Sequence, residues 1–129
     1  FDIRLMSGAE DILRTLSYQG ARHYVYTHRG ISTKPVLDNL GITYQFTELV
    51  SRLNRFPRKP APDALTYLIS KYNMDRNNTF YVGDRSIDME CARKAGIKGI
   101  LYLDPNGVGE RSGFEDYVVT DLRQIANLV

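Results

Sequence analysis

The chain has little of what marks a secreted, membrane-bound or nucleic-acid-binding protein. Its single cysteine, Cys91, cannot form a disulfide within the chain, and this favours a cytoplasmic protein. No apolar run approaches the roughly 18 residues of a membrane span. The net charge of +2 is too small to argue for nucleic acid as a partner. The start at Phe1 shows no initiator methionine and no signal-peptide pattern, so we expect a piece of a longer polypeptide.

Apolar runs of strand length alternate with segments of helical periodicity along the chain. This alternation predicts parallel strands with helices over both faces of the sheet, and thus three layers. With 129 residues, of which 43% are apolar, we expect one α/β domain over residues 1–129 with one core. Strands are expected at about 21–27, 45–51, 79–83, 99–103 and 117–120, and helices at about 7–20, 32–41, 63–72, 84–96 and 121–128.

The most informative stretch runs from Thr79 to Ala95. A short apolar run predicts a buried strand ending at Gly83, and a turn then brings Asp84 and Asp88 to the start of a helix. Spaced four residues apart, these carboxylates are expected to share one helical face at the carboxyl end of a strand, where open α/β sheets bind ligands. Both could simply cap the helix. A divalent cation shared between them, able to hold a phosphate, is the sharper hypothesis.

Two further polar residues are expected at the same edge of the sheet. Thr27 ends an apolar strand, and Lys59 lies in a basic, proline-rich loop after the next strand. Because the carboxyl ends of parallel strands lie on one edge, Thr27, Lys59 and Asp84 can converge into a phosphoryl-binding cradle. Each also has an ordinary explanation. Thr27 could merely end a strand. Lys59 could belong to a solvated basic cluster with Arg52, Arg55 and Arg58.

Taken in order, these motifs resemble those of the haloacid dehalogenase (HAD) superfamily, in particular its phosphoglycolate-phosphatase-like subgroup. An apolar strand ending in Thr or Ser, the family's second motif, is matched by Tyr24–Thr27. A Lys before a helix, often followed by Pro, is the third motif and is matched by Lys59–Ala64. The fourth, Gly-Asp-x-x-x-Asp after a strand, is matched by Gly83–Asp88. Order and approximate spacing agree over about residues 7–128.

The resemblance implies a HAD-like, Rossmann-like core and a Mg²⁺-dependent phosphatase that hydrolyses small phosphomonoesters through an aspartyl-phosphate. Three residues would act in catalysis: Thr27 would hydrogen-bond the phosphoryl group, Lys59 would steady the nucleophile and the phosphate, and Asp84 would coordinate Mg²⁺. Asp88 would support the metal or its waters.

The resemblance also points to residues that would contact the substrate, a small phosphorylated metabolite. The backbone amide of His28 would help Thr27 to hold phosphate, and the side chains of His28 and Arg85 are further candidates. His28 could equally be a hydrogen-bonded loop residue. The sequence indicates no nucleic-acid or membrane partner, and it says nothing of the oligomeric state.

The family's first motif, Asp-x-Asp-x-Thr or Val near the N-terminus, does not occur in these residues. In the family, the first Asp of this motif attacks phosphorus and the second is the general acid and base. The mobile cap that normally follows the motif is absent from these residues too. Without that Asp no covalent intermediate can form, and Mg²⁺ would lose ligands. We therefore expect the C-terminal part of a longer chain, lacking the N-terminal strand and cap and inactive alone.

Two other kinds of protein remain as alternatives. A non-catalytic HAD-like binding module would keep the fold without the nucleophile, although the fold does not require the trio Lys59, Asp84 and Asp88. A receiver domain of two-component signalling has similar size and residue types. Its order is acidic pair, Asp, Thr and Lys, whereas here Thr27 and Lys59 precede the acids.

Overall fold

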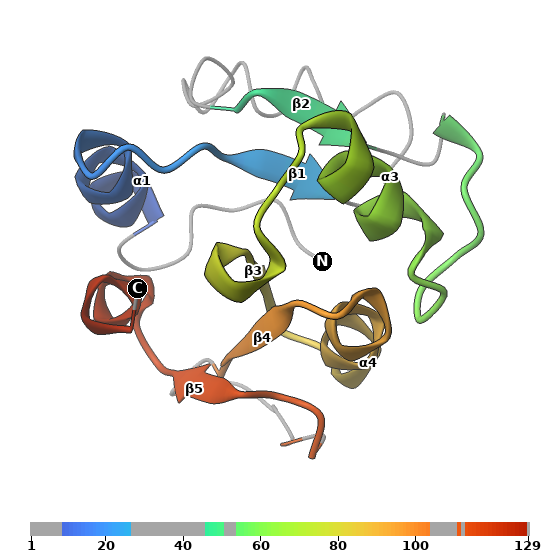
Figure 1. Ribbon diagram of the computed structural model, residues 1–129. Helices are drawn as coiled ribbons and strands as arrows, with labels where there is room; N and C mark the ends of the chain where they lie inside the picture. The colour runs from blue at the N-terminus through green and yellow to red at the C-terminus, as the bar shows by residue number, and fades with distance from the viewer. Residues whose placement is uncertain (1–8, 27–45, 51–53, 104–110, 112, 129) are drawn as a thin grey trace. The chain divides into compact units, whose positions relative to one another are not determined.

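A computed structural model describes residues 9–26, 46–50, 54–103, 111 and 113–128 (Figure 1). The chain groups into two compact units, residues 1–55 with 122–128 and residues 56–121 with 129, and each is described by itself. The expectation of one domain over residues 1–129 stays a prediction. No helix in the described part is long and apolar enough to cross a membrane.

The described residues of the first unit form two short parallel strands and two helical segments. These are α1 (Ala9–Tyr18), β1 (Tyr24–Tyr26), β2 (Glu48–Val50) and the 3₁₀ helix η4 (Leu122–Asn127). In the β1–β2 pair Tyr24 lies beside Glu48 and Tyr26 beside Val50. Helix α1 packs against η4, and each contributes buried apolar side chains: Ile12, Leu122 and Ile125. The expected helix 32–41 lies outside the described residues.

The closing segment is helical as expected, but it is a 3₁₀ helix rather than an α-helix. Leu122 and Ile125 are three residues apart, and the three-residue turn of a 3₁₀ helix places both on one face. Both are buried, whereas Leu128 is only half-buried.

In the second unit the described residues form a three-stranded sheet in the order β3-β4-β5, with both neighbouring pairs parallel. Tyr81 lies beside Gly99, and Leu101 beside Val118. The prediction of an α/β fold with a mostly parallel sheet is thereby confirmed. Its elements are α3 (Asp63–Lys71), the 3₁₀ turn η3 (Arg76–Asn78), β3 (Phe80–Gly83), α4 (Ser86–Ala95), β4 (Lys98–Tyr102) and β5 (Tyr117–Val119).

The core of this unit lies where α4 packs on β3 and β4 and where α3 packs on α4 (Figure 1). Ile100 and Leu101, on the central strand β4, are fully buried, which explains why that strand is apolar on both faces. Helix α4 approaches β4 closely: a Cβ at Gly99 would lie 2.8 Å from Sδ of Met89. The other buried apolar residues of the two helices are Ala64, Leu65, Leu68, Ile69, Cys91, Ala92 and Ala95.

Helix α4 begins two residues later than the sequence suggested. Its N-cap, Arg85, has extended backbone angles (φ −124°, ψ 152°), so helical geometry starts only at Ser86. The helix ends as expected at Gly96, which has the left-handed φ of 77° that glycine favours. Asp84 therefore lies in the turn before the helix. The expectation that Asp84 and Asp88 share a helical face is wrong.

Candidate functional site

Asp88 is the centre of a polar cluster at the carboxyl end of β3, and its position follows from the start of α4. As the third residue of that helix, it accepts a hydrogen bond at Oδ2 from the backbone N–H of Arg85, the N-cap, at 3.2 Å. This contact satisfies one of the free amides of the helix start, and a carboxylate there is also favoured by the helix dipole. One of the ordinary explanations of Asp88, that it caps the helix, is thus confirmed.

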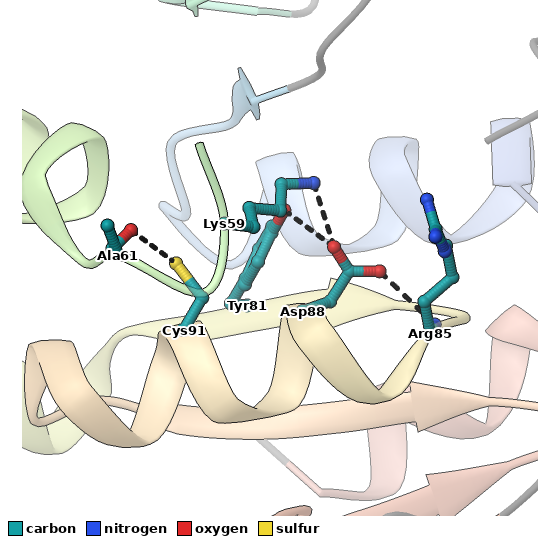
Figure 2. A network of polar contacts seen from close by, with 6 residues as sticks. All are labelled: Lys59, Ala61, Tyr81, Arg85, Asp88 and Cys91. Atoms are coloured by element: carbon teal, nitrogen blue, oxygen red, sulfur yellow. Dashed lines mark hydrogen bonds and ion pairs between the residues drawn. The ribbon is translucent and has the colours of Figure 1, made fainter. Parts of the chain in front are cut away.

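The other oxygen of Asp88 joins two residues from different elements (Figure 2). Its Oδ1 accepts a hydrogen bond from Lys59 Nζ at 2.8 Å and one from the Tyr81 hydroxyl at 3.3 Å. The side chains of Lys59 and Asp88 are only 9% and 6% exposed. Lys59 and Asp88 thus meet at this edge of the sheet, whereas the expected convergence of Lys59 with Thr27 and Asp84 stays a prediction.

Gly83 provides the space that the Asp88 side chain occupies. A Cβ built on Gly83 would lie 2.5 Å from both Cβ and Oδ2 of Asp88, distances that real side chains do not adopt. The last residue of β3 must therefore be glycine if the carboxylate is to reach the N-cap amide. This gives a structural reason for the Gly-Asp-x-x-x-Asp pattern in this chain.

Asp84 differs from Asp88 in having an oxygen without a partner. Its Oδ1 is buried and has no hydrogen-bond partner among the described residues, whereas donors there reach both oxygens of Asp88. A buried carboxylate oxygen without a donor costs free energy, and a cation would remove that cost. Carboxylate oxygen is the ligand type that Mg²⁺ prefers, so Asp84 fits a magnesium site. No group of three or more His, Cys, Asp or Glu with metal-binding spacing occurs among the described residues.

The remaining predicted site residues are placed only in part. Thr27 and His28 lie outside the described residues. Arg85 is exposed, and its side chain extends away from the Asp88 carboxylate in Figure 2, so its described contact with the cluster is through its backbone amide. Contact of these three residues with a substrate stays a prediction.

Tyr81 is the member of the cluster that the sequence motifs do not reveal, because it lies within an apolar run of strand length. Lys59 Nζ lies 5.3 Å from the centre of its ring, within the range of a cation–π contact, and its hydroxyl bonds Asp88. The available signal was period-two alternation, which puts Tyr81 on the same face of β3 as Gly83.

Cys91 lies one helical turn after Asp88 and has a structural environment. It is fully buried, and its thiol donates to the backbone oxygen of Ala61 at 3.4 Å. Burial raises its pKa from 9.0 to about 11, so the group remains a neutral thiol near neutral pH. A nucleophilic role for Cys91 is therefore not supported.

Comparison with known proteins decides the family. A family model described as haloacid dehalogenase-like hydrolase matches residues 2–102, most of the chain. The chain belongs to the haloacid dehalogenase-like hydrolases. The resemblance read from its motifs is confirmed, and so is the HAD-like fold.

Relatives of this HAD-like chain include phosphatases. It is 27% identical over 129 residues to a phosphoglycolate phosphatase of Haemophilus influenzae, covering 98% of this chain and 58% of the relative. It is 30% identical over 137 residues to an uncharacterized hydrolase of Saccharomyces cerevisiae, covering 95% of this chain and again 58% of the relative. The chain thus spans less than two thirds of the length of these proteins.

Solved structures of candidate phosphatases share the fold of this chain. The chain is similar to the crystal structure of a predicted phosphoglycolate phosphatase from Haemophilus somnus, with a TM-score of 0.85 and 25% identity over 98% of this chain and 58% of that one. It is also similar to the NMR structure of the core domain of a candidate phosphoglycolate phosphatase from Streptococcus pneumoniae. That match has a TM-score of 0.80 and 34% identity, and covers 99% of this chain and 89% of that one.

Proposed function

We propose that this chain is part of the catalytic core of a Mg²⁺-dependent phosphatase that hydrolyses small phosphomonoesters such as phosphoglycolate through an aspartyl-phosphate. Family membership and phosphoglycolate phosphatase relatives support the reaction class. The observation that carries the proposal is the buried ammonium of Lys59, 2.8 Å from Asp88, at the strand end that also holds the unpartnered oxygen of Asp84. A cation and an unsatisfied anionic ligand at one sheet edge suit a metal-assisted phosphoryl site.

Each site residue has a separate role in this proposal. Asp84 would hold Mg²⁺, which when bound draws electron density from a phosphoryl oxygen. Lys59 supplies positive charge for the phosphoryl group, and Asp88 holds that ammonium in place. Both oxygens of Asp88 already accept hydrogen bonds, so they are less available to a metal than the Asp84 oxygen that has no partner among the described residues. Direct metal ligation by Asp88 stays a prediction. Thr27 and the His28 amide would bind the remaining phosphoryl oxygens.

The nucleophile is the part of the reaction that residues 1–129 do not supply, because they contain no Asp-x-Asp motif. We propose that it lies on a preceding strand of a longer polypeptide, followed by a cap that selects the substrate. On this proposal the 129-residue chain alone is inactive and its location is cytoplasmic.

The test is phosphatase activity of the full-length protein that carries this chain, measured on p-nitrophenyl phosphate and phosphoglycolate with and without Mg²⁺. We expect hydrolysis that requires Mg²⁺ and falls by about 100-fold or more in Asp84→Asn and in Lys59→Met. Asp63→Asn, at an exposed position in the first turn of α3, is the matched control and should keep full activity. Full turnover in Asp84→Asn would refute the assignment, and no turnover at all would favour the non-catalytic module.

A further inference from the structure

We propose that Tyr81 is a positioning residue: its hydroxyl shares the Asp88 oxygen that binds Lys59 and thereby keeps the Lys59 ammonium available to a phosphoryl group. The inference rests on the proposed function. It adds to that function Tyr81, a half-buried residue of β3 that lies outside the motifs discussed so far. Figure 2 shows the three side chains converging from the loop before α3, from β3 and from α4.

The face of β3 that meets α4 allows the Tyr81 hydroxyl to reach the Asp88 carboxylate. Because side chains alternate along a strand, Tyr81 and Gly83, two residues apart, lie on the same face of β3. Gly83 leaves the space that Asp88 fills, and Tyr81 reaches the carboxylate with its hydroxyl at 3.3 Å. A phenylalanine at this half-buried position would keep the ring and lack the hydroxyl. The hydroxyl is the group of Tyr81 that reaches the Asp88 carboxylate.

The charge balance explains what the hydroxyl does. Asp88 is a buried carboxylate, and among the described residues its donors are Lys59, Tyr81 and the Arg85 amide. Each donor stabilises part of the negative charge. If the Tyr81 hydroxyl is removed, Oδ1 retains only the ammonium, which must then neutralise more of that charge. Lys59 is held more tightly by Asp88 and interacts less with an incoming phosphate.

Tyr81→Phe isolates this effect. The substitution keeps the ring, and with it the cation–π contact to Lys59 Nζ at 5.3 Å, and removes only the hydroxyl. Tyr117→Phe, on a half-buried tyrosine of β5 in the same sheet, is the matched control.

The experiment measures kcat and KM of the full-length protein on p-nitrophenyl phosphate with Mg²⁺, together with inhibition by inorganic phosphate. We expect Tyr81→Phe to raise KM and the phosphate inhibition constant by about threefold to tenfold, the effect of one hydrogen bond, with kcat changed less than about twofold. Tyr117→Phe should leave all three constants unchanged. A fall in kcat at constant KM is what a purely structural defect produces, because it lowers the active fraction, and it would overturn the proposal.

A second measurement separates this inference from the proposed function. The ¹⁵N NMR signal of the Lys59 ammonium, assigned by its loss in Lys59→Met, should be visible because burial and Asp88 slow its exchange with water. We expect Tyr81→Phe to shift this signal and Tyr117→Phe to leave it in place. If the wild-type protein hydrolyses no phosphoester, the proposed function fails and the shift alone decides whether Tyr81 positions Lys59. An unchanged signal would overturn the inference whether or not the protein is active.

Discussion

The buried ion pair between Lys59 and Asp88 should contribute much more to the free energy of unfolding than the exposed pair between Glu90 and Lys94 on α4. Lys59 Nζ lies 2.8 Å from Asp88, with the side chains 9% and 6% exposed. Lys94 and Glu90 are 3.2 Å apart, but 50% and 31% exposed. Removing one partner of a buried pair typically costs about 3–5 kcal/mol. Because Tyr81 still donates to the orphaned carboxylate, we expect Lys59→Met to cost about 3 kcal/mol, the lower end of that range.

A double-mutant cycle separates the pair from its surroundings. Lys59→Met leaves a buried negative charge, whereas the double variant with Asp88→Asn leaves none, so the two changes together should cost less than their sum. We expect a coupling energy of about 2 kcal/mol for this pair. The control cycle, Lys94→Met with Glu90→Gln, should give about 0.3–0.5 kcal/mol, because water screens an exposed pair on one helix face.

The assay is urea unfolding of all variants near neutral pH, followed by circular dichroism and checked for two-state behaviour and unchanged m-values. Added salt should reduce the small coupling of the control pair and have little effect on the buried pair. A coupling energy for Lys59 and Asp88 no larger than that of Lys94 and Glu90 would refute the reasoning, since it would mean that the carboxylate reaches water.

The glycines and the cysteine of the same unit give further predictions. Gly83→Ala should destabilise the protein by about 2–3 kcal/mol in urea unfolding, because the new methyl group meets the base of the Asp88 side chain. Gly99→Ala should cost less, because it meets the thioether of a flexible methionine; equal losses would count against this explanation. Cys91 should react with a thiol reagent only after unfolding. Because its pKa rises from 9.0 to about 11 in the folded state, the free energy of unfolding should fall as the pH rises from 9 towards 11, and a Cys91→Ala variant should lack that fall.

Most of the second unit could be predicted from the sequence because its patterns are strong and local. Leu65, Leu68 and Ile69 have helical spacing and are buried on α3. The apolar run before Gly83 forms β3, and Gly96 ends α4. Elements of this kind follow from the spacing of apolar residues and from glycine at positions that require it.

The start of α4 and the partner of Lys59 could not be predicted in the same way. Spacing alone places Asp84 and Asp88 on one helix face, but the extended backbone of Arg85 excludes Asp84 from the helix. Lys59 and Asp88 are separated by 29 residues, and their contact depends on how the proline-rich loop returns to the sheet. Tyr81 was overlooked because a tyrosine in an apolar strand looks like any other core residue until its hydroxyl has a partner.

The loop before α3 is attached to α4 at two points one helical turn apart. Lys59 bonds Asp88, and the backbone oxygen of Ala61 accepts from the thiol of Cys91. The loop cannot separate from the first half of α4 unless both contacts break. Amide hydrogens of the two segments should therefore exchange with solvent in a single cooperative opening, although they lie far apart in the chain.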